Sequence, residues 1–333
     1  MYRGSIPMKL SLVLPPYPGE QWALARQIGV THAVATLPDP DDDEHPWDMG
    51  PLGRMHRRLR EAGFAVDAVE ALPPLDRARL GLPGGDDEIE HVCTLIRNMG
   101  RLGIQVLCWN WMAGFGWLRT ETAHRTRGGA LVTGYDHGRV QGPAPIEAGR
   151  ADEGRLWDTL REFMQRVVPV AEAAGVKLAL HPDDPPLPQI RGVARIIRSP
   201  AALERATELV PSPGNGITYC QGTFAAMGAD VPATIRFFGE GSKIHFVHLR
   251  DIRGTAEHFE ETFPDDGQTD MLAAMRAYFD IGFDGPMRSD HVPTMATETN
   301  DRPGYGMLGH LFTTGYMKGL MEAAAAERVE RGG

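Results

Sequence analysis

The sequence predicts an α/β protein that folds as a (β/α)8 TIM barrel, in which parallel strands are surrounded by helices. Three observations lead to this prediction. Short strand-like apolar runs alternate with amphipathic helical stretches along the chain. The strand runs are almost continuously apolar, as in parallel sheets that are covered on both faces. Several helical stretches end on glycine, the residue that helix C-termini prefer.

Eight strands are expected. In chain order they occupy residues 9–14, 31–36, 65–72, 104–111, 176–181, 216–220, 243–250 and 284–291. Eight βα units in about 300 residues fit a closed barrel. An open doubly wound sheet is the alternative, but no GxGxxG motif follows the first strand, so a dinucleotide-binding crevice is not supported. We place no domain boundary and expect a single barrel domain over residues 1–333.

Amphipathic helices are expected between these strands. They cover residues 20–29, 51–63, 86–103, 154–175, 200–210, 232–240 and 270–282. The glycines that close them before the next strand are Gly29, Gly63, Gly103, Gly175 and Gly282. Strict alternation of strand and helix is what a parallel sheet requires, because each crossover returns the chain to the same end of the sheet.

Two segments are too long for ordinary connections between a strand and a helix. Residues 114–154 follow the fourth strand, and residues 251–270 follow the seventh. In a barrel both long loops lie on the C-terminal face, where active sites are built. They are either flexible surface insertions or covers over a site. Phe115 and Trp117 in the first segment favour packing over a site.

Composition excludes several classes of protein. The net charge of −10 and a pI near 5.6 do not suggest a nucleic-acid partner. Three cysteines are too few and too scattered for a disulfide framework. The apolar run near the N-terminus is too short for a secretory signal, and no stretch approaches the roughly 18–20 apolar residues of a membrane span. We therefore expect a cytoplasmic protein without membrane association.

Four chemically reactive side chains close consecutive predicted strands. His181, Cys220, His248 and Asp290 end the fifth to eighth strands. Neighbouring parallel strands lie about 4.8 Å apart, so these side chains are expected to converge on one ion. Two imidazoles, a thiolate and a carboxylate suit a divalent transition metal such as Mn²⁺, Fe²⁺, Co²⁺ or Zn²⁺.

Each of these residues, taken alone, also has an ordinary structural interpretation. A buried cysteine is usually a small hydrophobic residue, and we interpret Cys93 and Cys108 in this way. A histidine within a strand, such as His245, is usually a hydrogen-bonded core group, and an aspartate is often a helix N-cap. The prediction rests on the set, because the catalytic residues of barrel enzymes come from the ends of several strands.

The segment VKLALHPDDPPLP, residues 176–188, ends the fifth strand in an imidazole, two carboxylates and a run of prolines. Proline cannot continue a sheet ladder or occupy an ordinary helix interior. We expect these prolines to stiffen the loop that carries His181 and Asp183. Asp184 is interpreted as turn structure or as support for the site.

Several stretches resemble the mannonate dehydratase family, metal-dependent barrels related in fold to xylose isomerase. The similar stretches are residues 80–112, 177–186 (KLALHPDDPP), 212–223, 243–253, 269–291 and 302–306 (RPGYG), followed by a helical tail that includes residues 315–323. The resemblance runs from about residue 65 to the C-terminus and implies a Mn²⁺ or Fe²⁺ ion. It places the metal ligands on the same four residues and proton transfer on His291 and Tyr305.

The resemblance implies that D-mannonate loses water across C2 and C3 and gives 2-keto-3-deoxy-D-gluconate. A base must take the C2 proton, an acid must protonate the departing C3 hydroxyl, and a divalent ion would stabilise the developing charge. Sequence does not say which of His291 and Tyr305 is the acid. Asn110, Asp183 and Arg288 are the candidate substrate contacts.

The sequence departs from the family pattern around the expected substrate. SLVLPPYPGE replaces the usual first-strand motif, Gly116 stands where an aspartate is usual, and Val292–Thr294 replace a Gly-Arg sequence. None of these changes affects a predicted metal ligand. We therefore expect the metal site to be retained, while the sequence does not identify the sugar acid. A metal-dependent isomerase or epimerase and a non-catalytic sugar-acid binder are the alternatives. We expect a small-molecule sugar acid as partner and a homo-oligomeric assembly.

Overall fold

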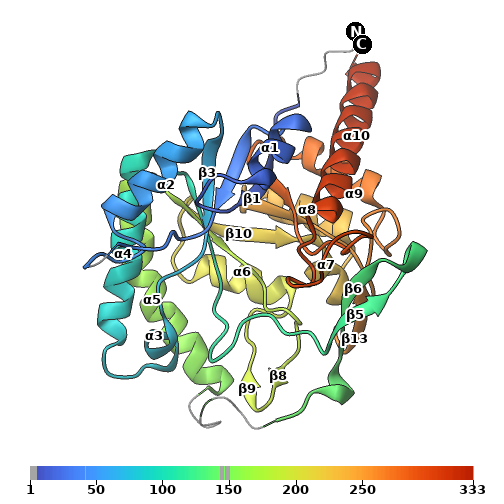
Figure 1. Cartoon of the computed structure of the whole chain (residues 1–333). Helices are drawn as coiled ribbons and strands as arrows, with labels where there is room; N and C mark the ends of the chain where they lie inside the picture. Colours follow the sequence, from blue (N-terminus) through green and yellow to red (C-terminus); the bar gives the residue numbers. More distant parts are fainter. Residues whose placement is uncertain (1–5, 42, 143–145, 147–150, 333) are drawn as a thin grey trace.

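The computed structural model describes residues 6–41, 43–142, 146 and 151–332, and a closed barrel of parallel strands forms its centre (Figure 1). Around the barrel the order is β1-β14-β11-β10-β7-β4-β3-β2. The strands are β1 (Lys9–Leu14), β2 (His32–Ala35), β3 (Ala65–Glu70), β4 (Val106–Trp109), β7 (Lys177–Leu180), β10 (Asn215–Cys220), β11 (Ile244–Leu249) and β14 (Pro286–Ser289). Each lies within or overlaps one predicted run, so the predicted fold is confirmed.

Helices pack outside the barrel (Figure 1). They are α1 (Glu20–Gln27), α2 (Met49–Glu61), α4 (Gly85–Leu102), α5 (Glu153–Ala174), α6 (Pro200–Glu208), α8 (Val231–Glu240), α9 (Met271–Asp280) and α10 (Met307–Gly332). The predicted closing glycines have left-handed backbone, for example Gly103 at φ 73° and Gly175 at φ 67°. Two short helices were not predicted, α3 (Asp76–Leu80) and α7 (Gln221–Ala226).

The core has two parts. A large cluster fills the space between the strands and the helices, and it includes Cys93 on α4. A small inner cluster contains Val34, Ala68, Val106, Cys108, Ala179 and Phe246. Small side chains dominate this inner cluster, which leaves room for polar groups at the strand ends above it. His245 is a core histidine as predicted, because its Nδ1 lies 2.9 Å from the Leu178 carbonyl oxygen.

The two long segments pair with each other. β5 (Glu121–Arg125), β6 (Leu131–Asp136), β12 (Ile252–Thr255) and β13 (His258–Glu261) form an antiparallel sheet in the order β12-β13-β6-β5. These parts of the two segments are therefore ordered and are not flexible insertions. Short 3-10 turns at Arg127–Gly129 and His137–Arg139 flank β6, and a hairpin of β8 (Gln189–Ile190) and β9 (Val193–Ala194) follows β7. Residues 143–145 and 147–150 of the first segment lie outside the described residues.

Within the described ranges, no helix combines the length and the apolar character that crossing a membrane requires.

The close approach of β10 and β11 yields a test of the packing. A Cβ added at Gly216 would overlap the carbonyl oxygen of Lys243 and lie 2.6 Å from Cε1 of His245. We expect Gly216→Ala to lower the free energy of unfolding by about 1–3 kcal/mol, as overpacking does. Urea denaturation followed by circular dichroism measures this change.

Gly53→Ala in α2 is the matched control. Nothing lies within 4 Å of a Cβ at Gly53, and the residue is inside a helix. We expect Gly53→Ala to raise the free energy of unfolding by roughly 0.5–1 kcal/mol. A Gly216→Ala protein at least as stable as the parent would contradict the packing of β10 against β11.

Candidate active site

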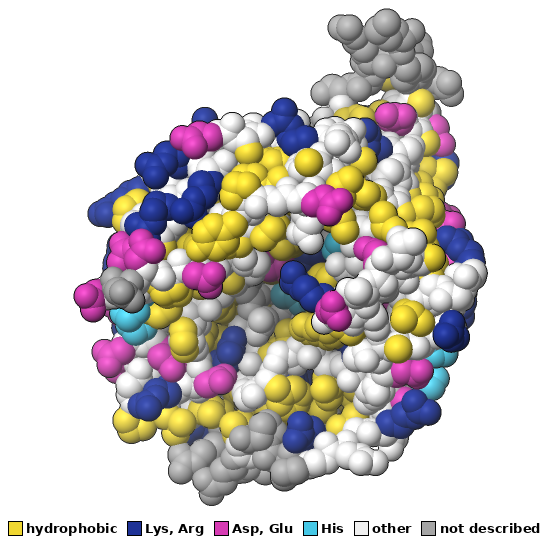
Figure 2. Space-filling view, viewed as in Figure 1, with side chains coloured by type: hydrophobic (Ala, Val, Ile, Leu, Met, Phe, Trp, Pro, Cys, Tyr) yellow, Lys and Arg dark blue, Asp and Glu magenta, His cyan; other side chains and the backbone are white. Residues whose placement is uncertain are grey.

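The carboxyl ends of the barrel strands open into a cavity of about 460 Å³. Figure 2 shows this face hollowed near its centre, with basic and histidine side chains at the hollow. Its polar lining residues are Glu70, Asp76, Arg79, Asn110, His181, Asp184, His248, Arg288, Asp290, His291 and Tyr305. The cavity thus lies on the C-terminal face, where the sequence placed the site.

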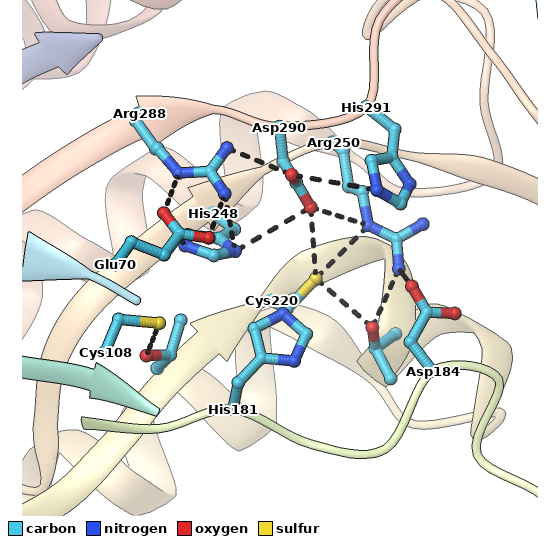
Figure 3. Close-up of polar contacts among 12 residues, drawn as sticks. Glu70, Cys108, His181, Asp184, Cys220, His248, Arg250, Arg288, Asp290 and His291 are labelled. Atoms are coloured by element: carbon cyan, nitrogen blue, oxygen red, sulfur yellow. Dashed lines mark hydrogen bonds and ion pairs between the residues drawn. The ribbon is translucent and has the colours of Figure 1, made fainter. Parts of the chain in front are cut away.

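The structure brings together the four residues that close consecutive strands. One donor atom from each of His181, Cys220, His248 and Asp290 lies within 4.8 Å of the others (Figure 3). Cys220 is the last residue of β10 and His248 the last but one of β11, while His181 and Asp290 directly follow β7 and β14. All these strands are parallel neighbours in the order β14-β11-β10-β7, which is why their ends converge.

This donor set fits a divalent transition metal. Nδ1 of His181 lies 2.7 Å from the Pro182 carbonyl oxygen, which leaves Nε2 to face the cluster. Nε2 of His248 is buried without a hydrogen-bond partner, 3.5 Å from a Glu70 oxygen, while its Nδ1 lies 3.7 Å from Oδ2 of Asp290. Buried polar atoms are rarely left unpaired unless a ligand or ion completes them. Imidazole, thiolate and carboxylate are the ligands that borderline metals accept.

The two anionic donors are kept ionised by neighbouring cations. Burial alone would raise the pKa of the Cys220 thiol, but Arg250 and His181 hold that pKa well below its usual value. Nε of Arg250 donates to the Cys220 sulfur at 3.2 Å. Burial opposes ionisation of Asp290 as well, yet His291 and Arg288 hold its pKa well below the usual range. Both residues are therefore ready to bind a cation.

The cluster also acts on its first histidine. Burial lowers the pKa of His181, but the Cys220 thiolate outweighs burial and raises this pKa to about 9. A proton on the imidazole of His181 therefore pairs with the thiolate. A metal ion would take the place of that proton, since a ligating imidazole must be neutral.

Arg288 connects the carboxylate of Asp290 to the opposite wall (Figure 3). Its Nε and Nη2 donate to Glu70 at 2.7 and 2.6 Å, and its Nη1 donates to Asp290 at 2.9 Å. Burial opposes ionisation of Glu70, but Arg288 lowers its pKa to about 2. Arg288 lines the cavity, as a substrate contact would, although these donors are already engaged with carboxylates.

His291 and Tyr305 face each other at the cavity. Nε2 of His291 lies 3.1 Å from the Tyr305 hydroxyl. The Tyr305 segment is held beside the end of β14 because the Val292 amide donates to the Gly304 carbonyl at 2.8 Å. The indole of Trp117 lies 4.8 Å from the His291 ring, between ring centroids, so the first long segment does pack over this pair.

A buried network of charges supports the pair. It consists of Arg119, Asp184, Arg250 and Glu261, each at most 9% exposed. Asp184 accepts from Arg119 at 2.9 Å and from Arg250 at 2.8 Å. Glu261 accepts from Nη2 of Arg119 and Nη1 of Arg250, both at 2.6 Å. This agrees with the interpretation of Asp184 as support for the site.

Four residues of the site were not predicted from the sequence: Arg119, Arg250, Glu261 and Glu70. Arg250 lies two residues after His248. Because alternate residues of a strand point to the same face, this spacing could have predicted that Arg250 lies on the side of His248. Glu70 ends β3 in the same way as the predicted ligands end their strands. Arg119 and Glu261 carried no such signal, because they meet only through pairing of the two long segments.

The other two predicted substrate contacts, Asn110 and Asp183, differ in whether they line the cavity. Asn110 lines the cavity, and its side-chain oxygen accepts from Nη2 of Arg79 at 3.1 Å. Asp183 does not line the cavity, because its carboxylate turns to accept the Ile197 amide at 2.7 Å. Asp184 is the member of this pair that lines the cavity. Asp183 holds the loop after β7 in place of contacting the cavity.

Curated relatives extend along most of the chain. The family model described as D-mannonate dehydratase (UxuA) matches residues 21–151 and 145–331. The mannonate dehydratase of Thermotoga petrophila is 34% identical over 334 residues, covering 90% of this chain and 92% of the relative. Mannonate dehydratase 2 of Halalkalibacterium halodurans is 32% identical over 307 residues, covering 84% and 88%.

Solved structures agree with this relationship. The crystal structure of mannonate dehydratase from Streptococcus suis serotype 2 has a TM-score of 0.90 and 31% identity, covering 96% of this chain and 94% of that one. A structure of L-ribulose 3-epimerase has a TM-score of 0.61 and 18% identity, covering 92% and 89%, which is a likeness of fold alone. The family model and these relatives together show that the chain belongs to the D-mannonate dehydratase (UxuA) family, on a xylose isomerase-like barrel.

Proposed function

We propose that this protein is a metal-dependent hydro-lyase that converts D-mannonate to 2-keto-3-deoxy-D-gluconate and water. One observation carries the proposal: His181, His248 and Asp290 line the same cavity as the His291–Tyr305 pair, and the sulfur of Cys220 lies within 4.8 Å of their donor atoms. A dehydration that begins next to a carboxylate needs a cation for the developing charge and two proton-transfer groups. Membership of the family adds independent support.

The proposed ligands are His181, Cys220, His248 and Asp290, and the proposed ion is Mn²⁺ or Fe²⁺. When bound, such an ion supplies Lewis acidity to the substrate carboxylate and the C2 hydroxyl. The role of Arg288 and Glu70 in this proposal is to hold Asp290, because the guanidinium donates to both carboxylates.

The protein groups supply the proton transfers and the shape of the site. Burial and nearby Asp290 raise the pKa of Tyr305, so its hydroxyl keeps a proton to donate. Trp117 lines this part of the cavity with its ring against His291 and limits the access of water. Asn110 and Arg79 lie on the wall formed around β3 and β4, across the barrel from β14, and would contact the distal hydroxyls of the sugar acid.

Removing the thiolate tests the metal site. We expect Cys220→Ala to weaken metal binding by more than the roughly 10–100-fold that loss of a residue supporting a ligand costs. Metal content after gel filtration, measured by mass spectrometry, and turnover should both fall. Cys93→Ala, buried in the core on α4, is the control and should keep both. Full metal occupancy in Cys220→Ala would show that the cysteine only packs.

Removing one hydroxyl tests proton transfer. Tyr305→Phe is expected to retain metal and fold but to lose about 10²–10⁴-fold in kcat, the usual contribution of a general acid or base. The control is Tyr316→Phe on α10, whose side chain does not line the cavity. Turnover close to that of the parent in Tyr305→Phe would remove this residue from the mechanism.

A panel of aldonates tests the reaction and the substrate. We expect Mn²⁺-loaded protein to form 2-keto-3-deoxy products from six- or five-carbon sugar acids, with D-mannonate the first candidate. A Cβ at Gly116 would meet nothing within 4 Å, so the cavity wall is open where the family pattern has an aspartate. A polar site rejects mismatched hydroxyls by up to about 10⁴–10⁵-fold, so another aldonate can be preferred. An isomerised sugar, or no product from any acid, would overturn the dehydratase proposal.

A further inference from the structure

We propose that Glu261 is a positioning residue that fixes His291 in the tautomer with hydrogen on Nδ1, which makes Nε2 the atom that accepts the substrate proton. The catalytic consequence rests on the proposed function, but the tautomer itself does not. Glu261 lies at the end of β13, in the sheet built from the two long segments. The sheet therefore takes part in the chemistry by holding Glu261 against His291.

The Nδ1 edge of the His291 ring faces Glu261. Nδ1 lies 2.9 Å from Oε1 of Glu261. Burial alone would raise the pKa of Glu261, but Arg250 and Arg119 lower it to about 2, so the carboxylate is ionised. An ionised carboxylate oxygen can only accept a hydrogen bond. The contact therefore requires a hydrogen on Nδ1.

A second neighbour of Nδ1 has to be considered, because Nη2 of Arg119 lies 3.1 Å away. This nitrogen carries two hydrogens. Shorter contacts use both of them, at 2.6 Å to Oε1 of Glu261 and at 2.9 Å to Oδ2 of Asp184. No hydrogen remains for Nδ1, so Arg119 does not compete for its lone pair. The carboxylates on either side of Arg119 thus decide the tautomer of His291.

The opposite edge of the ring follows from this assignment. With its hydrogen on Nδ1, neutral His291 presents a lone pair at Nε2, and the Tyr305 hydroxyl at 3.1 Å donates to it. Nε2 is then the site that takes the proton from C2 of the substrate, and the negative charge of Glu261 stabilises the imidazolium that forms. Carboxylate support of an imidazolium is the arrangement found in serine protease triads.

The proton balance closes within this pair. The C2–H bond breaks and its proton goes to Nε2 of His291. Its electron pair forms the C2–C3 double bond while the C3–O bond breaks. The departing oxygen takes the Tyr305 proton and leaves as water, and the enol product tautomerises to the 2-keto acid. Transfer from Nε2 to the Tyr305 oxygen across 3.1 Å then restores both residues.

Two substitutions at Glu261 separate its acceptor role from its charge. In Glu261→Ala the acceptor is gone, and one hydrogen of Arg119 Nη2 is free to donate to Nδ1, so the hydrogen of His291 should move to Nε2. In Glu261→Gln the amide oxygen can replace Oε1, while its NH₂ takes the place of Oε2, which has no hydrogen-bond partner. Glu261→Gln should therefore keep the parent tautomer without the charge.

The tautomer is read from long-range ¹H–¹⁵N NMR spectra of ¹⁵N-histidine-labelled protein loaded with diamagnetic Zn²⁺. The His291 signals are identified by their loss in His291→Gln. We expect protonated Nδ1 in the parent and in Glu261→Gln, and protonated Nε2 in Glu261→Ala. The kcat should fall about 10²–10⁴-fold in Glu261→Ala, with KM little changed. In Glu261→Gln it should fall roughly tenfold, because a neutral hydrogen bond is weaker than a charge-assisted one.

Glu260→Ala is the matched control on the same strand. Glu260 pairs with Arg253 and His124 on the outer side of the network, so its loss should leave the His291 signals and kcat unchanged. If Glu261→Ala does not fold, Glu261→Gln decides alone: reduced kcat with the parent tautomer supports the proposal, and unchanged kcat overturns it. Protonated Nε2 in the parent also overturns it. If the parent dehydrates no aldonate, the proposed function fails while the tautomer measurement still decides the role of Glu261.

Discussion

The site depends on the pairing of charges that water does not reach. Arg250 is 2% exposed and donates to the thiolate of Cys220 and to the carboxylates of Asp184 and Glu261. Its Nε also lies 3.2 Å from Asp290. Taking an ion out of water costs several kcal/mol, so such a cation is stable only where anions surround it. One guanidinium therefore contacts all four of these anions, and Arg119 and Arg288 hold three of them from other sides.

The need to pair these buried charges links the barrel to the antiparallel sheet. Arg250 directly follows β11, whereas Arg119 precedes β5 and Glu261 ends β13. Removing one partner of a buried pair leaves an uncompensated charge and typically destabilises by about 3–5 kcal/mol. The two long segments thus each contribute a buried charge, Arg119 from the first and Glu261 from the second. Pairing of these segments brings Arg119 and Glu261 to the charged residues that follow the strand ends, such as Arg250.

The part of the fold that could be predicted is the part set by local patterns. Apolar runs and closing glycines located the barrel strands and the main helices, and parallel strand ends explain why Cys220 and His248 meet. The contact between Arg119 and Glu261 joins residues 142 positions apart through antiparallel pairing, which no periodicity announces. Asp183 and Asp184 are adjacent and chemically identical, so only tertiary hydrogen bonds decide which of them lines the cavity.

Binding of an ion and recognition of a substrate depend on different parts of the fold, the strand ends and the loops. The four donors stand at strand ends, which the hydrogen-bonded barrel holds rigidly, whereas Trp117 and Tyr305 stand on loops. Changes in loops can therefore alter the sugar acid without disturbing the donors, and the departures at Gly116 and Val292–Thr294 lie in such loops. His291 belongs to both parts: its backbone follows a strand end, and its ring contacts Glu261. A loop substitution that moves Glu261 would reach the chemistry through this one ring.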